Sequence, residues 1–172
     1  MILKTIVAAL LIQTGPATQI THKEADRALS ALKAKHRPDR IAMIDAVIKA
    51  AAKHGVDPIW LLAVAYAESR HNAKLKGDKG KSHGPFQMTI SAARAAYKRT
   101  KVTELYKWET AADVAAKYWA RLISKYGHKV APVIYNCGPI RCKKKNGKHI
   151  RSTPATRAYW RYYNKMNKGR KP

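Results

Sequence analysis

The segment 58–67 constrains the fold most, because its residues are apolar on every side of a helix (PIWLLAVAYA). A helix that is apolar all round is normally buried. Asp57 and Pro58 directly before it are favourable residues for a helix cap and a first turn. We therefore expect the chain to fold around a buried helix that ends at Glu68 and Ser69.

Most other segments also show helical periodicity, and none shows long strand-like alternation. Thr21 and Glu24 fit a capping box, and Gly55 is a typical helix end. Residues 72–83 are polar and glycine-rich, which indicates a loop or short hairpin. The sequence predicts a mainly α fold, in one domain for 172 residues, with further helices over 21–36, 41–54, 91–99, 110–127 and 132–136, and from 154.

The N-terminus has the pattern of a secretory signal. Lys4 gives a positive start, residues 5–12 are apolar, and the small residues 15–17 suit cleavage. We expect a signal peptide over 1–17 and a periplasmic or secreted protein; the alternative is an N-terminal core helix. No stretch approaches the roughly 18 to 20 apolar residues of a membrane span.

The chain is strongly basic, with a net charge of +25. Lys4 is the only charged residue in 1–17, so cleavage would leave +24. Such a charge attracts polyanions, among them nucleic acid and a bacterial cell wall rich in carboxylates. Charge alone does not choose between these partners, although it predicts adsorption that weakens with salt.

The two cysteines, Cys137 and Cys142, lie close together in the sequence. A disulfide between them is plausible in an exported protein, and the small loop it would close is worth only ~2 kcal/mol. Two free thiols are the alternative. The spacing is not a metal-binding pattern, and we expect no metal and no cofactor.

Glu68 is an unusual residue at the end of so apolar a helix. Leu61, Val64 and Ala65 lie on the same side of that helix. Apolar surroundings and the negative end of the helix dipole both raise the pKa of a carboxyl group. A carboxyl group protonated near neutral pH can act as the general acid that cleaves a glycosidic bond. The alternative is that Glu68 simply emerges into solvent.

Several motifs share their order and spacing with one known family. They are Glu68–Ser69, Gly84–Met88, Tyr118–Leu122, Ile134–Pro139 and Thr156–Tyr159. Over about residues 41–165 the chain resembles the soluble lytic transglycosylase domain of the lysozyme-like superfamily. The resemblance implies a lysozyme-like fold with a loop or hairpin after the catalytic helix. Together with the signal peptide expected over 1–17, it divides the chain into that signal peptide, an N-terminal helical extension (18–38), the transglycosylase domain (39–166) and a basic tail (167–172).

The resemblance also implies roles for individual residues. Glu68 would be the catalytic acid and then the base. The residues implied in sugar binding or in shaping the cleft are Ser69, Gln87, Met88, Tyr135, Asn136 and Tyr159. For most of them a structural role is the alternative, as a loop tie or a core side chain. Ala155, Pro85–Phe86 and Ile134 depart from the family pattern, which affects the details of the sugar subsites.

A second resemblance concerns Asp78. Residues 78–87 are similar to the stretch that follows the catalytic Glu in invertebrate-type lysozymes, which use a Glu and an Asp about ten residues apart. Glu68 and Asp78 have that spacing. Two carboxylates would permit hydrolysis by a retaining route, whereas a single Glu suits a transglycosylase. The alternative for Asp78 is a turn residue.

The sequence therefore predicts a peptidoglycan lytic transglycosylase, which cleaves the β-1,4 bond between MurNAc and GlcNAc and leaves 1,6-anhydroMurNAc ends. One alternative is a lysozyme-type muramidase that uses Glu68 and Asp78. Another is a basic nucleic-acid-binding protein that uses residues 141–151 and the C-terminus. Expected partners are peptidoglycan glycan strands and the machinery of secretion, conjugation or a phage, with no specific nucleic acid. We expect a monomer.

Overall fold

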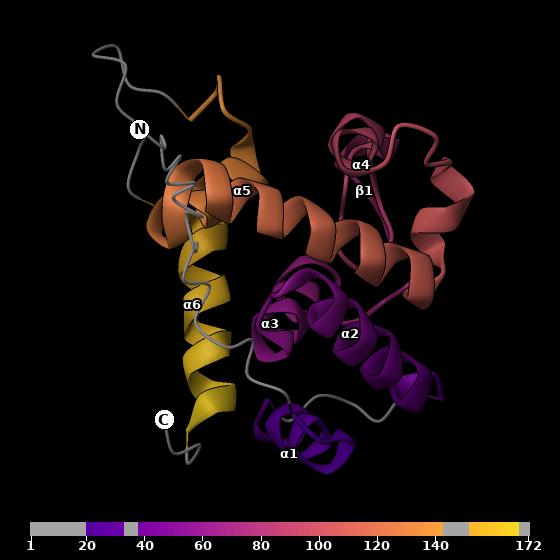
Figure 1. Ribbon diagram of the computed structural model, residues 1–172, viewed down its shortest axis with the longest axis vertical. Helices are drawn as coiled ribbons and strands as arrows, with labels where there is room; N and C mark the ends of the chain where they lie inside the picture. The colour runs from indigo at the N-terminus through magenta and orange to yellow at the C-terminus, as the bar shows by residue number, and fades with distance from the viewer. Residues whose placement is uncertain (1–19, 33–37, 143–151, 169–172) are drawn as a thin grey trace, which may run out of the picture.

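The structure, a computed structural model, describes residues 20–32, 38–142 and 152–168. This part of the chain is mainly helical, as predicted (Figure 1). The predicted signal peptide (1–17), most of the basic stretch 141–151 and the end of the tail lie outside the described residues. The elements are α1 (His22–Ala31), α2 (Arg40–His54), α3 (Pro58–Ser69), β1 (Lys76–Gly77), η1 (Asp78–Gly80), β2 (Ser82–His83), α4 (Ile90–Ala96), η2 (Val102–Tyr106), α5 (Trp108–Cys137) and α6 (Pro154–Asn167).

Helix α3 is the buried centre of the fold, which confirms the expectation from its composition. An Oδ1 atom of Asp57 accepts a hydrogen bond of 2.8 Å from the backbone N–H of Ile59 and so caps the helix. Residues 61–65 have no measurable exposure. Helices α6 and α2 pack against α3, and α1 and α5 also contact it, so the central helix is enclosed by its neighbours (Figure 1).

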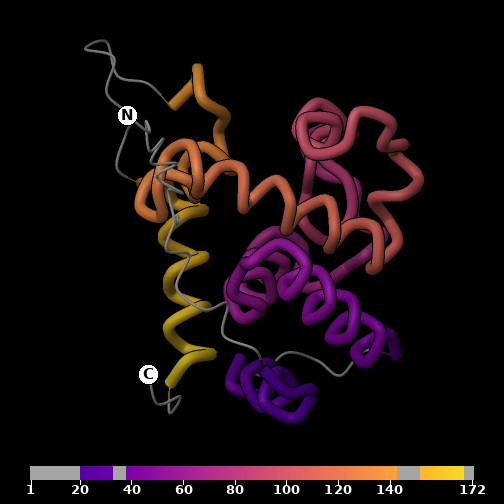
Figure 2. Tube along the Cα trace, in the orientation of Figure 1, coloured from indigo at the N-terminus to yellow at the C-terminus, as the bar shows by residue number. Residues whose placement is uncertain are grey.

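Helix α5 is broken at Gly127, where the sequence predicted an end. Gly127 has φ 73° and ψ 163°, a left-handed conformation that suits glycine. Figure 2 traces the chain through this break to the arm that ends at Cys137. The predicted short helix around Pro132 is this arm. The break brings Tyr135 and Asn136 back toward the end of α3, where they reach the functional site.

Three predicted helix boundaries were wrong. Helix α1 ends at Ala31 rather than near 36, because the N–H of Leu32 turns back to the carbonyls of Leu29 and Ser30 and closes the helix. Helix α4 begins at Ile90 rather than at 91, because Thr89 is its cap: Thr89 has extended backbone angles, and its hydroxyl accepts from the N–H of Ala92. The same helix ends at Ala96 rather than near 99, since Tyr97 already has extended backbone angles.

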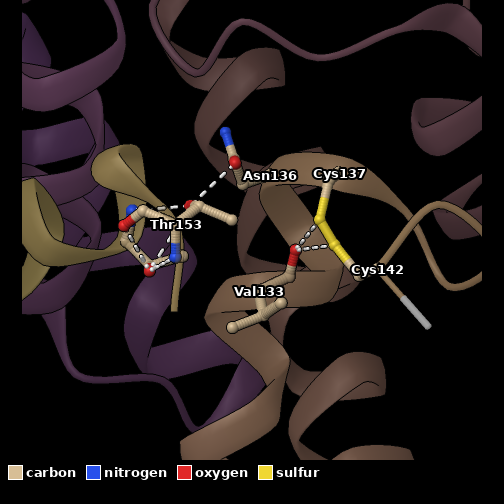
Figure 3. The surroundings of a disulfide bond; sticks show 6 residues. Val133, Asn136, Cys137, Cys142 and Thr153 are labelled. Carbon is tan, nitrogen blue, oxygen red and sulfur yellow. Dashed lines mark hydrogen bonds between the residues drawn. A yellow bond between two sulfur atoms is a disulfide. The ribbon is translucent and has the colours of Figure 1, made fainter. Parts of the chain in front are cut away.

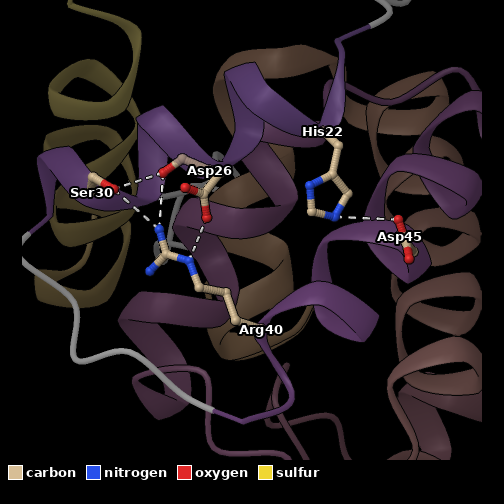
Figure 4. A network of polar contacts seen from close by, with 5 residues as sticks. All are labelled: His22, Asp26, Ser30, Arg40 and Asp45. Atoms are coloured by element: carbon tan, nitrogen blue, oxygen red, sulfur yellow. Dashed lines mark hydrogen bonds and ion pairs between the residues drawn. The ribbon is translucent and has the colours of Figure 1, made fainter.

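Helix α1 is attached to α2 by a buried arginine (Figure 4). Arg40 is 8% exposed. Its Nε donates to Asp26 Oδ1 at 2.7 Å and its Nη2 donates to the Asp26 carbonyl at 2.9 Å. A second pair joins His22 and Asp45 at 3.4 Å, with the Asp45 side chain 65% exposed. None of the described helices is both long and apolar enough to cross a membrane.

The substitution Asp26→Ala is expected to lower the free energy of unfolding by about 1–3 kcal/mol, because it leaves a buried guanidinium without its charged partner. Asp45→Ala is the matched control and should change stability by less than about 0.5 kcal/mol, because that ion pair is exposed. Urea unfolding of both variants measures the difference. Equal losses would contradict a special role for the buried pair.

Candidate active site

Glu68 is the penultimate residue of α3 and is mostly buried. Burial raises its pKa from an ordinary 4.5 to about 7. A hydrogen bond from Tyr159 opposes this effect, and the negative charge of Asp78 reinforces it. A carboxyl group with this pKa is partly protonated at neutral pH and can both donate and accept a proton.

The partner of Glu68 comes from the far end of the chain. The hydroxyl of Tyr159, on α6, donates a hydrogen bond to Glu68 Oε1. Tyr159 has no measurable exposure, and burial raises the pKa of its phenol, so that it stays a proton donor. Its ring makes edge contacts with Trp60 and Tyr135 at 6.3 and 6.4 Å. Tyr159 therefore binds the Glu68 carboxyl from the buried side of the site.

The Glu68 residue also lines a cleft of about 770 Å³. The cleft lies between the hairpin region, α4 and α5. It brings together most of the residues that the sequence singled out, whereas Ser69 and Tyr159 are not among its lining residues. The predicted residues that line it are Glu68, Asp78, Gln87, Met88, Tyr135, Asn136 and Cys137.

Ser69 and Gln87 hold the loop that forms one wall of the cleft. The buried hydroxyl of Ser69 contacts the carbonyls of Ala65 and Pro85 at 2.9 and 2.8 Å. The Gln87 amide donates to the carbonyls of Leu75 and Gly84 at 3.1 and 2.8 Å. Both side chains therefore tie loop backbone together, the structural alternative considered for Gln87, although Gln87 also faces the cleft.

Asp78 stands at the turn of the hairpin formed by β1 and β2. Its φ of 47° is left-handed, and its Oδ2 accepts a hydrogen bond of 2.6 Å from the Ser82 hydroxyl. It also lines the cleft and acts electrostatically on Glu68. Asp78 is thus a turn residue that also brings a second carboxyl group into the cleft of Glu68.

Tyr135 and Asn136 form the opposite wall at the end of α5. The Tyr135 hydroxyl donates to the Phe86 carbonyl at 2.8 Å, and its ring stacks on Trp119 at 4.6 Å. Asn136 Oδ1 accepts a hydrogen bond of 2.9 Å from the hydroxyl of Thr153, the N-cap of α6 (Figure 3). These contacts connect the loop, α5 and α6 around the site.

A disulfide joins Cys137 and Cys142, whose Cα atoms are 5.8 Å apart (Figure 3). Both sulfur atoms lie 3.3 Å from the carbonyl oxygen of Val133. The short loop that the disulfide closes contributes Gly138, Pro139 and Arg141 to the cleft. The disulfide therefore shapes the rim of the site.

The cleft also contains residues to which the sequence assigned no role in it. Tyr118, which begins the 118–122 motif shared with the family, lines the cleft. Arg141, the exposed first residue of the basic stretch 141–151, supplies the one positively charged side chain among the described lining residues. Within the described residues no group of three or more His, Cys, Asp or Glu side chains could hold a metal ion.

A mainly helical fold with a protonatable glutamate in a cleft is the arrangement expected of a lysozyme-like glycan-cleaving enzyme. The family model for the transglycosylase SLT domain matches residues 45–156, most of the chain, and the protein belongs to this family. The family acts on peptidoglycan. The match begins within α2 and ends within α6 before Tyr159, so the partner of Glu68 lies just beyond it. A comparison with curated proteins gave no match.

Proposed function

We propose that the protein is a peptidoglycan lytic transglycosylase that cleaves the β-1,4 bond between MurNAc and GlcNAc and leaves 1,6-anhydroMurNAc ends. One observation carries the proposal: Glu68 is a mostly buried carboxyl with a pKa of about 7 in a cleft large enough for several sugar rings. Ser69, Gln87, Met88, Tyr135 and Asn136 are proposed to shape this cleft for the glycan.

In the proposed reaction Glu68 acts twice. Its protonated carboxyl first donates a proton to the bridging oxygen as the bond from MurNAc C1 to that oxygen breaks, which releases the GlcNAc hydroxyl. The Glu68 carboxylate then takes the proton of the MurNAc 6-hydroxyl while O6 forms a bond to C1. Tyr159 is proposed as a positioning residue, since it holds one carboxyl oxygen of Glu68 in place through both steps.

A second candidate is a muramidase that adds water instead. Its support is that Asp78 lines the same cleft as Glu68 and is close enough to influence its charge. In a retaining mechanism the second carboxylate would be the nucleophile. Against this role, the Ser82 hydroxyl already binds Asp78 Oδ2.

Product analysis distinguishes the two reactions. Purified sacculi digested by the protein and by Asp78→Asn are compared by mass spectrometry. The transglycosylase proposal expects anhydro ends from both proteins. Reducing ends from the unmodified protein, together with loss of cleavage in Asp78→Asn, would replace it by the muramidase. The absence of any cleavage would contradict both.

Glycan cleavage is expected to decline as the pH rises through about 7, because only protonated Glu68 can start the reaction. Two pH units above its pKa about 1% of a carboxyl group remains protonated, so the rate should fall about a hundredfold. Initial rates on sacculi at several pH values measure this limb. Asp78→Asn should move it to lower pH, since the charge of Asp78 raises the pKa of Glu68. A rate that stayed constant up to about pH 9 would exclude Glu68 as the acid.

Export is proposed through a signal peptide over residues 1–17, to the periplasm or the exterior. The disulfide supports this location, because disulfides persist mainly in oxidising compartments. The nucleic-acid-binding alternative depended on residues 141–151, most of which lie outside the described part of the chain. Family membership favours a glycan as the ligand.

A further inference from the structure

The charged side chains of the cleft are divided between its walls. The carboxyl groups of Glu68 and Asp78 come from the end of α3 and from the hairpin region. The guanidinium of Arg141 comes from the loop that follows the end of α5. It is the one positively charged group among the described lining residues. A ligand that enters the cleft therefore meets negative charge on one side and positive charge on the other.

Arg141 has no structural role that occupies its guanidinium. Its side chain is exposed, and it makes no hydrogen bond or ion pair with another residue in the described part of the chain. Arg40 shows the opposite case, because it is buried and its Nε binds Asp26 Oδ1 at 2.7 Å. The N–H donors of Arg141 are thus available to a ligand in the cleft.

The backbone that bears Arg141 is nonetheless fixed. Cys142, the next residue, has no measurable exposure and forms the disulfide with Cys137 (Figure 3). Its backbone N–H donates to the Gly138 carbonyl at 3.3 Å, which closes the loop a second time. Because the loop is held at both ends, the base of the Arg141 side chain stays at the rim of the cleft. Less conformational freedom is then lost when a ligand binds.

We propose that Arg141 binds a carboxylate of the peptide stem carried by MurNAc and so makes the cleft selective for strands that bear stems. The choice of this ligand rests on the proposed function. In the intact wall the lactyl carboxyl of MurNAc is in amide linkage to the peptide and is uncharged, and so are the sugar rings. The negative charges of the strand are therefore the carboxylates of its stems. A planar guanidinium can donate two parallel hydrogen bonds to such a group.

The negative charge of Asp78 adds an orientation to this selectivity. Asp78 lines the same cleft from the hairpin region, whereas Arg141 stands on the loop after α5. A negatively charged stem is attracted by Arg141 and repelled by Asp78, so it should extend toward the loop 138–141 and away from the hairpin. Charged groups across an interface act in this way mainly on specificity. Arg141 is thus a specificity-determining residue with no part in proton transfer.

Binding is tested with the full chain carrying Glu68→Gln, so that no probe is cleaved. The probes are a GlcNAc–MurNAc tetrasaccharide with peptide stems, the same sugar after an amidase has removed the stems, and an uncharged tetramer of N-acetylglucosamine. Addition of Arg141→Gln should weaken binding of the stem-bearing probe about 5-fold, measured by calorimetry, and leave the other two unchanged. The amidase-treated sugar carries a free lactyl carboxylate, so an equal or larger loss for this probe would overturn the proposal.

Two further variants control for charge. Arg27→Gln removes the same charge from an exposed arginine of α1 that does not line the cleft, and it should change none of the affinities. Arg141→Lys keeps the charge but loses the parallel pair of hydrogen bonds, so it should retain part of the selectivity for stems. Added salt should reduce this selectivity in the parent, because exposed charges are screened. An equal loss in Arg27→Gln and Arg141→Gln would reduce the effect to net charge and overturn the proposal.

Cleavage assays separate this proposal from the proposed function. In the chain with intact Glu68, Arg141→Gln should raise KM for soluble stem-bearing strands about 5-fold and leave kcat unchanged. A lower kcat at unchanged KM would overturn the assignment of Arg141 to binding. If the protein cleaves strands but Arg141→Gln binds every probe as its parent does, the selectivity for stems is wrong and the enzyme assignment stands. If the selectivity depends on Arg141 and no cleavage occurs, the stem site stands and the reaction is wrong.

Discussion

Glu68→Gln is expected to reduce glycan cleavage by about 10³-fold or more, because the proposed reaction uses this one group for both proton transfers. Glutamine has the same shape, and its Oε1 can still accept the hydrogen bond from Tyr159. The fold should therefore survive while the proton is lost. Release of soluble fragments from sacculi measures the effect. Glu109→Gln, an exposed glutamate at the start of α5, is the matched control and should retain full activity.

Glu68→Gln should also be more stable than the unmodified protein at alkaline pH. Burial raises the pKa of Glu68 from 4.5 to about 7. The protonated carboxyl therefore makes its full contribution to the stability of the fold below about pH 4.5, and this contribution is lost as the pH rises through 7. Above that range the ionised carboxyl destabilises the fold by at most about 3 kcal/mol. Urea unfolding at acid and alkaline pH should show a gain for Glu68→Gln only at alkaline pH. A gain in stability of equal size at acid and at alkaline pH would exclude ionisation as the cause of the gain. In the cleavage assay, an activity of Glu68→Gln near that of the unmodified protein would contradict the assignment of Glu68.

Gly84→Ala is expected to destabilise the fold by about 3–5 kcal/mol, in the range of strained or clashing backbone sites. Gly84 has φ 72°, and a Cβ there would collide with the backbone oxygen of Leu105. A backbone atom cannot move aside as a flexible side chain can. The Gly84 carbonyl also accepts from the Gln87 amide, so a shift would distort the wall of the cleft and lower activity as well.

Gly55→Ala is the matched control for this change. Gly55 has a similar φ of 65°, but a Cβ there would meet nothing within 4 Å. Its replacement should cost only about 1–2 kcal/mol for the left-handed conformation. Urea unfolding of the two variants separates the backbone strain from the collision. Equal losses would show that the close approach to Leu105 is not important.

Local pattern was enough to predict the elements that organise the site. The all-round apolar character of 58–67 fixed the buried helix and the unusual place of Glu68, and Gly127 marked the break in α5. Helix ends were less predictable, because Thr89 and Ser91 are both good caps and only the backbone angles distinguish them.

The contacts between distant segments could not be read from the sequence. Tyr159 was expected to shape a sugar site, yet it lies buried behind Glu68, 91 positions away in the chain. Its position depends on how α6 packs along α3, which no local periodicity encodes.

The hydrogen bond between Tyr159 and Glu68 also determines when the site can be completed during folding. Glu68 belongs to α3 and its partner to α6, so the carboxyl can meet the phenol only after the chain has been synthesised through residue 159 and α6 has packed. Helices α1 to α5 can form contacts earlier, but in a nascent chain the centre of the site is incomplete. The proposed activity thus depends on the packing of α6 and not only on the synthesis of Glu68 itself.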